Sequence, residues 1–305
     1  MAVDSEPTLS EFLARTQTDL EDLYAKECCW TSLRRRAGLH EQPADDWDKV
    51  VERALSRMLH IDDDRLERFA ALLHVATPPT GDASDPYQRL LYVALGQMRR
   101  SFHDLGAFWE DLWERPWLRE EMLALLRLLK DRSRHLSSRM APPLADVALR
   151  LHATYSRDEI FAAFDERNKN DGVLRTQSGI HNVKSRKTEL LFVELEKSEK
   201  HYSPSTLYND FPITRSRFRW ESQSAAHPET PAGRRYLAAK AGAEQKVVLF
   251  VRQRRKDSRG HTLPYLCLGL CAYGGHAGAK PMRIDWDLQV AMPAWWFQET
   301  KAAGG

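Results

Sequence analysis

The sequence predicts an α+β protein in which an all-helical N-terminal region precedes a mixed, curved β-sheet or partial barrel. Apolar residues recur with helical spacing through residues 1–140, and with strand-like spacing beyond about residue 170. Pro142-Pro143 marks a seam between the two patterns. We therefore expect a helical domain over 1–145 and a sheet domain over 150–300, and 305 residues suffice for two domains with cores of their own.

Helical signals run through the N-terminal half. Thr8-x-x-Glu11 and Thr18-x-x-Glu21 both have the spacing of a capping box, in which each side chain satisfies an orphan backbone donor. Apolar residues between 46 and 60 fall three or four positions apart, which predicts one stripe along a helix. Similar stripes cover 64–75, 87–99 and 117–130. The Pro, Gly, Ser and Asp content of 76–86 predicts a loop.

Strand signals dominate the C-terminal half, after a short helix that Ser156-x-x-Glu159 caps. Runs rich in Val, Leu, Ile and aromatic residues predict strands at 172–176, 188–195, 246–252, 263–273 and 282–290. A further helix is expected near 231–241. The glycines of 274–278 predict an inter-strand turn, and the aromatic residues of the last strand and tail are expected to close the core: Trp286, Trp295, Trp296 and Phe297.

Composition narrows the class of protein. Apolar residues make up 42% and charged residues 29%, as in a soluble globular protein, and no apolar run approaches the roughly 18 residues of a membrane span. The acidic N-terminus MAVDSEPTLSEF lacks a secretory core, so we expect a cytoplasmic protein without a membrane partner. The four cysteines lack zinc-site spacing and are expected to be buried free thiols: Cys28, Cys29, Cys267 and Cys271. We expect no metal and no cofactor.

The net charge of +2 hides an asymmetry between the two halves. Residues 1–150 carry a balance of −5, and residues 151–305 a balance of +7. A nucleic-acid reader joined to an acidic spacer would show this distribution.

The segment 197–223, KSEKHYSPSTLYNDFPITRSRFRWESQ, carries the densest signal. It combines aromatic residues with Asp210, with amide and hydroxyl groups, and with arginines. A pocket for an extruded base needs flat apolar faces, a polar group for the base edge and cations for the flanking phosphates. A carboxylate suits cytosine because it accepts from the exocyclic amine. The same composition also fits a hydrophobic core with polar turn caps, so both interpretations stay open.

Several motifs of this region occur in a fixed order: KSE-x-x-YSP, Y-x-D, F-x-W-x-SQ and TPAGRRY. With them, residues 150–297 resemble a C-terminal domain of unknown function found behind bacterial helicase cores, often with a phospholipase-D-type nuclease at the front. Residues 18–39 are similar to the helical segment that joins such helicases to this domain. The sequence contains neither a Walker A motif nor the His-x-Lys signature of phospholipase D. We therefore expect a binding module and not an enzyme.

The last domain of such fusions is thought to be similar to SET-and-RING-associated (SRA) base-flipping domains that read 5-methylcytosine. The resemblance thus implies double-stranded DNA with a modified cytosine, 5-methylcytosine first, as the partner in modification-dependent restriction or phage defence. It also implies helicase or nuclease domains of a parent protein as partners. The expected base-pocket residues are Tyr208, Asp210, Phe211, Trp220, Ser222 and Gln223, with Phe211 standing where we expect tyrosine.

A basic run, RQRRKDSRGH (252–261), follows a predicted strand and contains Ser-Arg-Gly, so we expect an exposed hairpin loop. Such a loop could lie on DNA phosphates and supply salt-dependent affinity; an ordinary solvated charge cluster is the alternative. The expected backbone-contacting residues are Tyr202, Ser203, Arg215, Arg217, Arg219, Arg234, Arg235, Arg252, Arg254, Arg255, Lys256 and Arg259.

Two other function classes compete with DNA reading. Asp210 with Glu244-x-Lys246 could mimic the carboxylates and lysine of a metal-dependent nuclease, although such sites usually carry Glu-x-Lys at the end of a strand and not before it. The helical half could be a protein-interaction module that docks on a helicase or nuclease subunit. That role is compatible with DNA reading in the other half.

Overall fold

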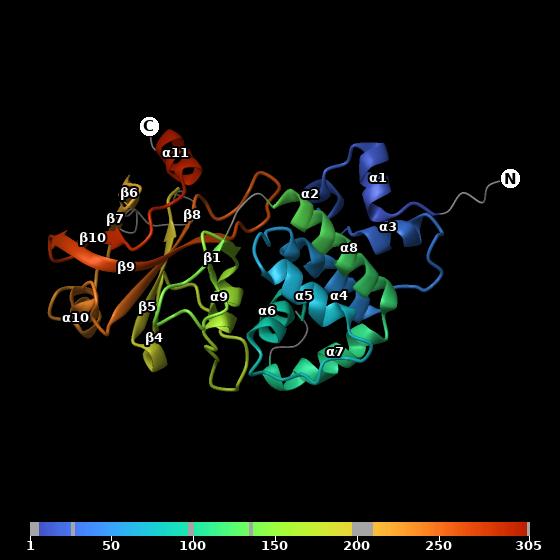
Figure 1. The fold of residues 1–305 in the computed structure, drawn as a ribbon, viewed down its shortest axis with the longest axis horizontal. Helices are drawn as coiled ribbons and strands as arrows, with labels where there is room; N and C mark the ends of the chain where they lie inside the picture. The colour runs from blue at the N-terminus through green and yellow to red at the C-terminus, as the bar shows by residue number, and fades with distance from the viewer. Residues whose placement is uncertain (1–5, 26–27, 97–100, 134–136, 197–209, 304–305) are drawn as a thin grey trace. The chain divides into compact units, whose positions relative to one another are not determined.

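The computed structural model describes residues 6–25, 28–96, 101–133, 137–196 and 210–303 (Figure 1). The chain divides into two compact units: unit 1 consists of Met1–Leu136 and Arg157–Arg175, and unit 2 of Ser137–Ser156 and Thr176–Gly305. Residues 157–175, which follow the predicted seam in the chain, thus belong to unit 1. The predicted fold class, α+β with helices first and a mixed sheet after them, is confirmed.

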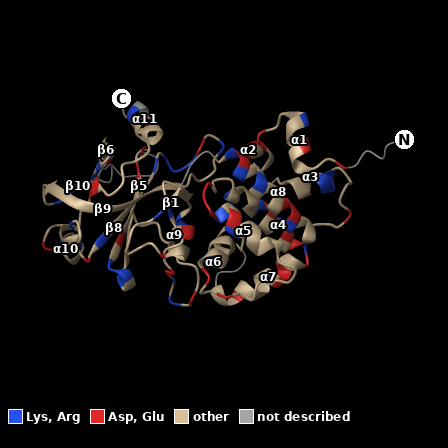
Figure 2. Cartoon of the chain, in the orientation of Figure 1, with Lys and Arg blue, Asp and Glu red and all other residues tan. Residues whose placement is uncertain are grey.

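Unit 1 is built from helices. They are α1 (Leu9–Thr16), α2 (Leu20–Leu23), α3 (Trp30–Arg36), α4 (Asp46–Ala54), α5 (Arg65–His74), α6 (Pro86–Leu95), α7 (Leu105–Trp113), α8 (Pro116–Arg132) and α9 (Arg157–Ala163). The apolar stripes predicted over 64–75, 87–99 and 117–130 correspond to α5, α6 and α8. Basic and acidic residues are interspersed on these helices (Figure 2). Among the described residues, no helix has both the length and the apolar character needed to cross a membrane.

Two predicted caps had different outcomes. Thr8 and Glu11 form the predicted capping box at the start of α1. The box predicted at Thr18 was wrong, because α2 begins one residue later with Asp19 as its N-cap and without a side-chain capping bond. A sequence spacing cannot distinguish two adjacent capping candidates when both have suitable side chains.

A buried ion network ties α9 into unit 1. The Glu159 carboxylate, on α9, accepts from Arg65 Nη1 at 2.6 Å and lies 2.8 Å from His60 Nε2. Arg65 is fully buried and also donates from Nε to Asp63 at 2.7 Å. Removing one partner would leave a buried charge without compensation, so this network holds α9 with the preceding helices.

Unit 2 contains an eight-stranded mixed sheet. Its strands are β3 (Thr154–Tyr155), β4 (Ile180–Val183), β5 (Thr188–Glu194), β6 (Phe211–Thr214), β7 (Arg217–Glu221), β8 (Lys246–Arg252), β9 (Tyr265–Ala277) and β10 (Arg283–Leu288). The order is β4-β5-β8-β9-β10-β7-β6, and β3 pairs with β9 outside this path. β5 and β8 are parallel, and the other pairs are antiparallel. A separate two-stranded sheet joins β1 (Ser138–Arg139) to β2 (Arg150–Leu151).

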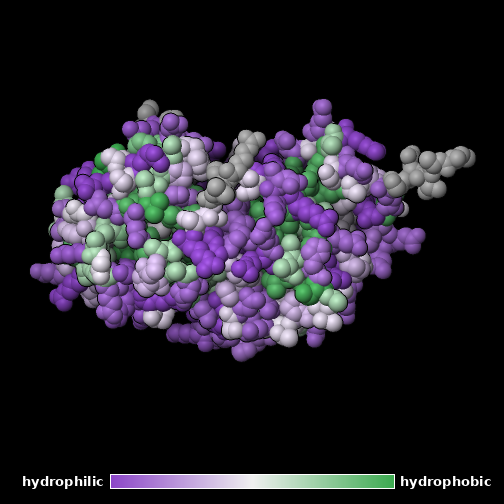
Figure 3. Space-filling model, viewed as in Figure 1, coloured by the Kyte–Doolittle hydropathy of each residue, from purple (hydrophilic) through white to green (hydrophobic). Residues whose placement is uncertain are grey.

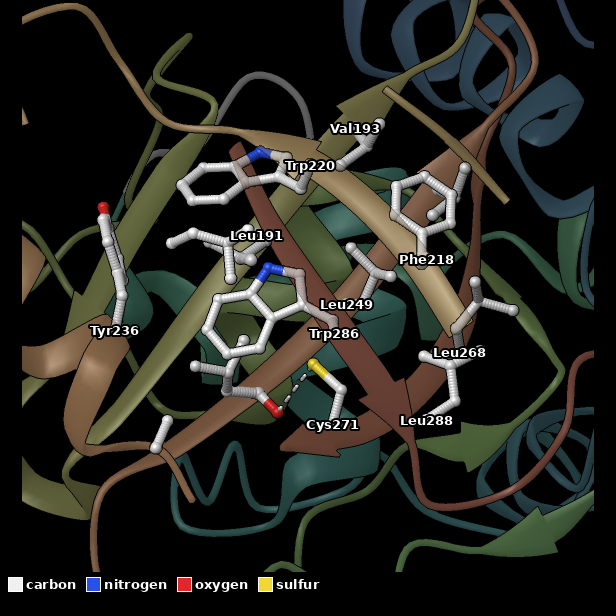
Figure 4. Packing of buried hydrophobic residues seen from close by; sticks show 14 of the residues in the cluster. Leu191, Val193, Phe218, Trp220, Tyr236, Leu249, Leu268, Cys271, Trp286 and Leu288 are labelled. Atoms are coloured by element: carbon white, nitrogen blue, oxygen red, sulfur yellow. Dashed lines mark hydrogen bonds between the residues drawn. The ribbon is translucent and has the colours of Figure 1, made fainter. Parts of the chain in front are cut away.

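The centre of the sheet is buried on both faces, since β5 and most of β8 are buried residue after residue. Leu191, Val247 and Leu249 belong to the main core, which α10 (Pro231–Ala238) covers with Tyr236. Figure 4 shows Leu191 and Leu249 in this core. On the opposite face, Phe192 stacks on Phe250 with ring centroids 5.6 Å apart. The central sheet thus supplies a rigid support for its outer strands.

Three details of unit 2 differ from the sequence prediction. The strand predicted at 172–176 is wrong, because these residues belong to unit 1 or its border and form only isolated bridges. β9 continues through Gly274-Gly275 to Ala277, where a turn was predicted. The tail forms helix α11 (Ala294–Ala303), on which Trp295 is exposed. As predicted, the four cysteines, all within the described residues, are thiols that form no disulfide, and all except the half-buried Cys28 are buried.

Candidate nucleic-acid interface

β7 and β10 separate a core face from an open polar face. Residues in these strands alternate, so that Phe218, Trp220 and Trp286 are buried. Figure 4 shows these three rings pointing into the same core. The residues between them, Arg217, Arg219, Glu221, Arg283, Asp285 and Asp287, lie on the other face. β7 and β10 thus place charged side chains, and no apolar ones, on this face.

Opposite charges meet across the open face. β7 and β10 pair in a register that sets Arg217 beside Asp287 and Arg219 beside Asp285. Arg217 Nε donates to Asp287 Oδ1 at 2.7 Å. Arg219 donates twice, from Nε to Asp285 Oδ1 at 2.8 Å and from Nη2 to Oδ2 at 3.0 Å. These carboxylates raise the pKa of both guanidinium groups, chiefly through the side-chain hydrogen bonds.

Phe211 provides an exposed aromatic ring beside this pair. It lies opposite Arg219 in the β6–β7 register and is 42% exposed, an unusual degree for phenylalanine. The Arg219 guanidinium lies 5.7 Å from the centroid of its ring. The neighbouring Asp210 accepts from the backbone N–H of Glu221 at 2.8 Å, which fastens the start of β6 to the end of β7.

A hollow of about 250 Å³ opens at this end of the sheet. Its lining combines two guanidinium groups, a carboxylate, an imidazole and two small residues: Arg219, Arg283, Asp285, His276, Gly275 and Ala277. His276 Nδ1 lies 2.6 Å from the hydroxyl of Tyr273 on the same strand. Within the described residues, Arg283 forms no ion pair, whereas Arg219 and Asp285 are paired with each other. The hollow therefore offers donors, an acceptor and an unpaired cation in one place.

Most of the basic run forms an exposed hairpin between β8 and β9, as predicted, but Arg252 is the buried last residue of β8 and not part of the loop. Asp257 shapes its tip, because Oδ1 accepts from the backbone N–H groups of Arg259 and His261 at 2.9 and 2.8 Å. Burial acts to raise the pKa of Asp257, but these hydrogen bonds outweigh it and the net shift is downward. We define the exposed Arg254, Arg255 and Lys256 as the basic loop. Arg254 approaches Glu196 at 3.9 Å.

The basic loop and the hollow lie at opposite ends of β9. The loop precedes Tyr265, the first residue of β9, and the hollow is lined by Gly275 to Ala277, its last residues. A strand of 13 residues spans about 40 Å at 3.3 Å per residue. The sheet therefore keeps the two features apart.

Several predicted site residues occupy other places in unit 2. Trp220 is 4% exposed and packs edge-on against Tyr236 at 5.2 Å. Ser222 is fully buried, and its Oγ accepts from the backbone N–H of Met282 at 2.9 Å. Gln223 follows on the surface. Both buried side chains belong to the core of unit 2 and not to the hollow, which matches the core interpretation that the composition left open.

The predicted cations also divide into paired and unpaired groups. Arg252 is 8% exposed and binds Glu194 Oε2 through Nε and Nη2, at 3.0 and 2.7 Å. Arg235 pairs with the buried Glu189, and Arg215 Nε donates to the Met292 carbonyl at 3.0 Å. Arg234 is exposed on α10. Tyr202, Ser203 and Tyr208 lie outside the described residues.

The residues of the nuclease alternative are not brought together. Lys246 is the first residue of β8, and the residue after it pairs with Cys271 on β9. Cys271 lies in the part of β9 that borders the Arg217 end of β7 across β10. Asp210 binds Glu221, at the other end of β7. Glu244 pairs with Lys187, and Lys246 Nζ donates to the Ala243 carbonyl. Over the described part of the chain, no group of three His, Cys, Asp or Glu residues could hold a metal ion.

The hollow and the exposed Phe211 both lie within the part of unit 2 that a family model covers. Residues 149–299 match the domain of unknown function DUF3427. DUF3427 is often found in helicase-associated proteins. No curated protein matches the chain. The DUF3427 match begins at the second strand of unit 2 and ends within α11, so it includes the whole eight-stranded sheet.

Five lining residues of the hollow were missed from the sequence: Gly275, His276, Ala277, Arg283 and Asp285. The glycine-rich stretch suggested a turn, because a strand interior rarely contains two adjacent glycines. A signal for Asp285 was present in the alternation of MRIDWDL, whose polar residues share one face. That face could have been identified as the partner of the Arg217–Arg219 face by its opposite charge.

Proposed function

We propose that residues 149–299 form a DNA-binding module that recognises a modified cytosine, 5-methylcytosine first, after the base has flipped out of the duplex. In this proposal the module is the specificity part of a helicase-type restriction or defence protein. It binds and does not itself cut or unwind DNA, and unit 1 docks on the motor or nuclease part of the parent protein.

The observation that carries the proposal is the position of the exposed Phe211 beside Arg219, which lines the hollow. A flipped base needs an aromatic face for stacking and polar groups for its edge. Phe211 is exposed next to Arg219, and Arg219 also lines the hollow with Asp285. The volume of about 250 Å³ is below the roughly 300–1,000 Å³ of drug-sized ligand pockets and suits a small flat group.

Phosphate binding is assigned to cations that have no buried carboxylate partner. Arg283 stands at the hollow, where it can bind a phosphate next to the flipped nucleotide. The basic loop is exposed at the other end of β9 and can contribute affinity that carries no sequence information. Arg235 and Arg252 are better explained as structural ion pairs, because their partners Glu189 and Glu194 are buried.

The test is a binding series with the full chain on one duplex that carries cytosine, 5-methylcytosine or 5-hydroxymethylcytosine at a single position, at fixed salt. We expect the tightest binding to 5-methylcytosine. A 2-aminopurine next to the modified position should brighten on binding, because flipping removes its stacking neighbour. Equal affinity for the three duplexes, without a change in fluorescence, would contradict the proposal.

A further inference from the structure

We propose that the Arg219–Asp285 pair reads the Watson–Crick edge of the flipped base and selects cytosine over thymine. This inference rests on the proposed function and names the specificity-determining residues of that site. Asp285 would take the role of base-edge acceptor that the sequence suggested for Asp210.

The geometry of the pair leaves hydrogen-bonding groups available. Arg219 uses Nε and one Nη2 hydrogen on Asp285, at 2.8 and 3.0 Å, out of the five N–H donors of a guanidinium. Asp285 accepts one bond on each oxygen, and an ionised carboxylate has about four acceptor positions. Both side chains line the hollow and are partly exposed, at 37% and 23%. Donors and an acceptor therefore lie side by side there.

Two contacts hold the guanidinium plane in place. Asp285 binds Arg219 through two hydrogen bonds, one to each carboxylate oxygen, which is the bidentate arrangement that an arginine–carboxylate pair favours. The ring of Phe211 lies 5.7 Å away on the neighbouring strand. The Arg217–Asp287 pair in the adjacent row has a single hydrogen bond and does not line the hollow. The Arg219–Asp285 pair is thus already held in position before a base binds.

The pattern of the pair complements cytosine. The Watson–Crick edge of cytosine presents two acceptors, O2 and N3, next to the donor N4 amine. Arg219 can donate to the acceptors while Asp285 accepts from the amine. Thymine presents N3–H to the arginine donors and O4 to the carboxylate, so two like groups meet at both positions. Unpaired buried polar groups reject such an analogue strongly.

Small residues in the lining leave room for the 5-methyl group. Gly275 has no side chain, and Ala277 offers only a methyl group, which is a suitable apolar contact for a base methyl. Thymine carries the same 5-methyl group as 5-methylcytosine. The Watson–Crick edge alone therefore distinguishes the two bases. The Arg219–Asp285 pair is the part of the hollow that offers both donors and an acceptor to that edge.

The experiment compares the full chain on two duplexes that differ at one base, 5-methylcytosine opposite guanine and thymine opposite guanine. The mismatch lowers the cost of flipping thymine and so works against the expected preference. We expect the wild type to favour 5-methylcytosine about ten- to a hundred-fold. Asp285→Asn should abolish or invert this ratio, because the carboxamide can donate to thymine O4. Asp287→Asn, one row away, should keep it.

Two further variants separate the alternatives. Arg219→Lys keeps the charge but loses the planar donor edge, so it should lose base preference and keep salt-dependent affinity. This variant tests the pair independently if Asp285→Asn folds poorly. Asp210→Asn should retain the preference. A wild-type ratio in both Asp285→Asn and Arg219→Lys, or its loss in Asp210→Asn with an unchanged melting temperature, would overturn the assignment of the pair. Failure of the wild type to prefer 5-methylcytosine over unmodified cytosine would instead overturn the proposed function.

Discussion

The two faces of β7 and β10 use the same strands for different purposes. On one face Phe218, Trp220 and Trp286 form part of the core, where packing determines which side chains fit. On the other face charged residues pair across the strands and leave a hollow open at one end. Strand alternation alone produces this division. It places a candidate recognition surface directly on the other side of strands that pack in the core of unit 2.

The comparison also separates two kinds of arginine. Arg252 is buried with Glu194 at the end of β8, and its guanidinium lies 4.4 Å from the Tyr265 ring centroid. Arg219 has a carboxylate partner too, but it is exposed and lines the hollow. Sequence alone treats both as candidate DNA contacts. Their burial distinguishes them, because Arg252 is packed inside the sheet whereas Arg219 lies on its surface.

On the face shown in Figure 3, hydrophobic side chains form small separate patches within a largely hydrophilic surface. An exposed aromatic ring is therefore informative mainly through its neighbours. Phe211 has Arg219 beside it, whereas the exposed Trp295 on α11 has Trp296, with ring centroids 5.7 Å apart. The first of these two rings adjoins a residue that lines the hollow.

The largest effect should come from the core face. We expect Trp220→Ala to lower the free energy of unfolding by about 3–5 kcal/mol, because it removes a buried ring and leaves a cavity. Denaturant unfolding measures this, with Arg217→Ala as a control on the same strand that should unfold almost as the wild type does. A small effect of Trp220→Ala would mean that the faces of β7 are assigned the wrong way round.

Local pattern accounts for much of the fold but not for its long-range pairing. The apolar stripes of α5, α6 and α8 and the runs of β5 and β8 are visible in sequence because each has one clear period. The bond between Arg219 and Asp285 joins residues 66 positions apart, and no local signal sets that register. Glu159 joins α9 to Arg65 across 94 positions in the same way.

The candidate site was predictable only in part. The sequence pointed to Phe211 and Arg219 through the density of aromatic and basic residues. It could not separate Trp220 from Phe211, because composition does not say which aromatic ring is buried. The other half of the hollow comes from β9 and β10, whose residues become neighbours of β7 through strand pairing alone.

The next effect concerns the open face. We expect Phe211→Ala to weaken binding to a duplex with 5-methylcytosine by about 1–3 kcal/mol, the usual cost of losing one base–aromatic stack. The melting temperature should stay unchanged because the ring is exposed. Phe211→Tyr keeps the aromatic face and should bind as the wild type does. Equal binding by the alanine variant would remove Phe211 from the interface.

A smaller effect, without base preference, is expected at the opposite end of β9. Changing Arg254, Arg255 and Lys256 to glutamine should weaken binding equally for modified and unmodified duplexes. It should also flatten the dependence of log affinity on log salt by about 0.9 for each phosphate that the loop no longer neutralises. A matched triple variant on unit 1, at the exposed Arg15, Lys49 and Lys130, serves as the control. An unchanged salt slope in the loop variant would show that the loop does not touch DNA.

The smallest effect should come from the ladder row outside the hollow. Arg217 and Asp287 are each 44% exposed, and water and salt screen most of their attraction. We expect Asp287→Asn to shift the melting temperature only slightly at low salt and not at all at high salt. Base preference should also be unchanged, because neither residue lines the hollow. Thermal melting at the two salt concentrations, followed by the 5-methylcytosine and thymine duplexes, measures both. A salt-independent loss of stability would mean that this row supports the sheet as the core face does, and the contrast between the two faces would then have to be withdrawn.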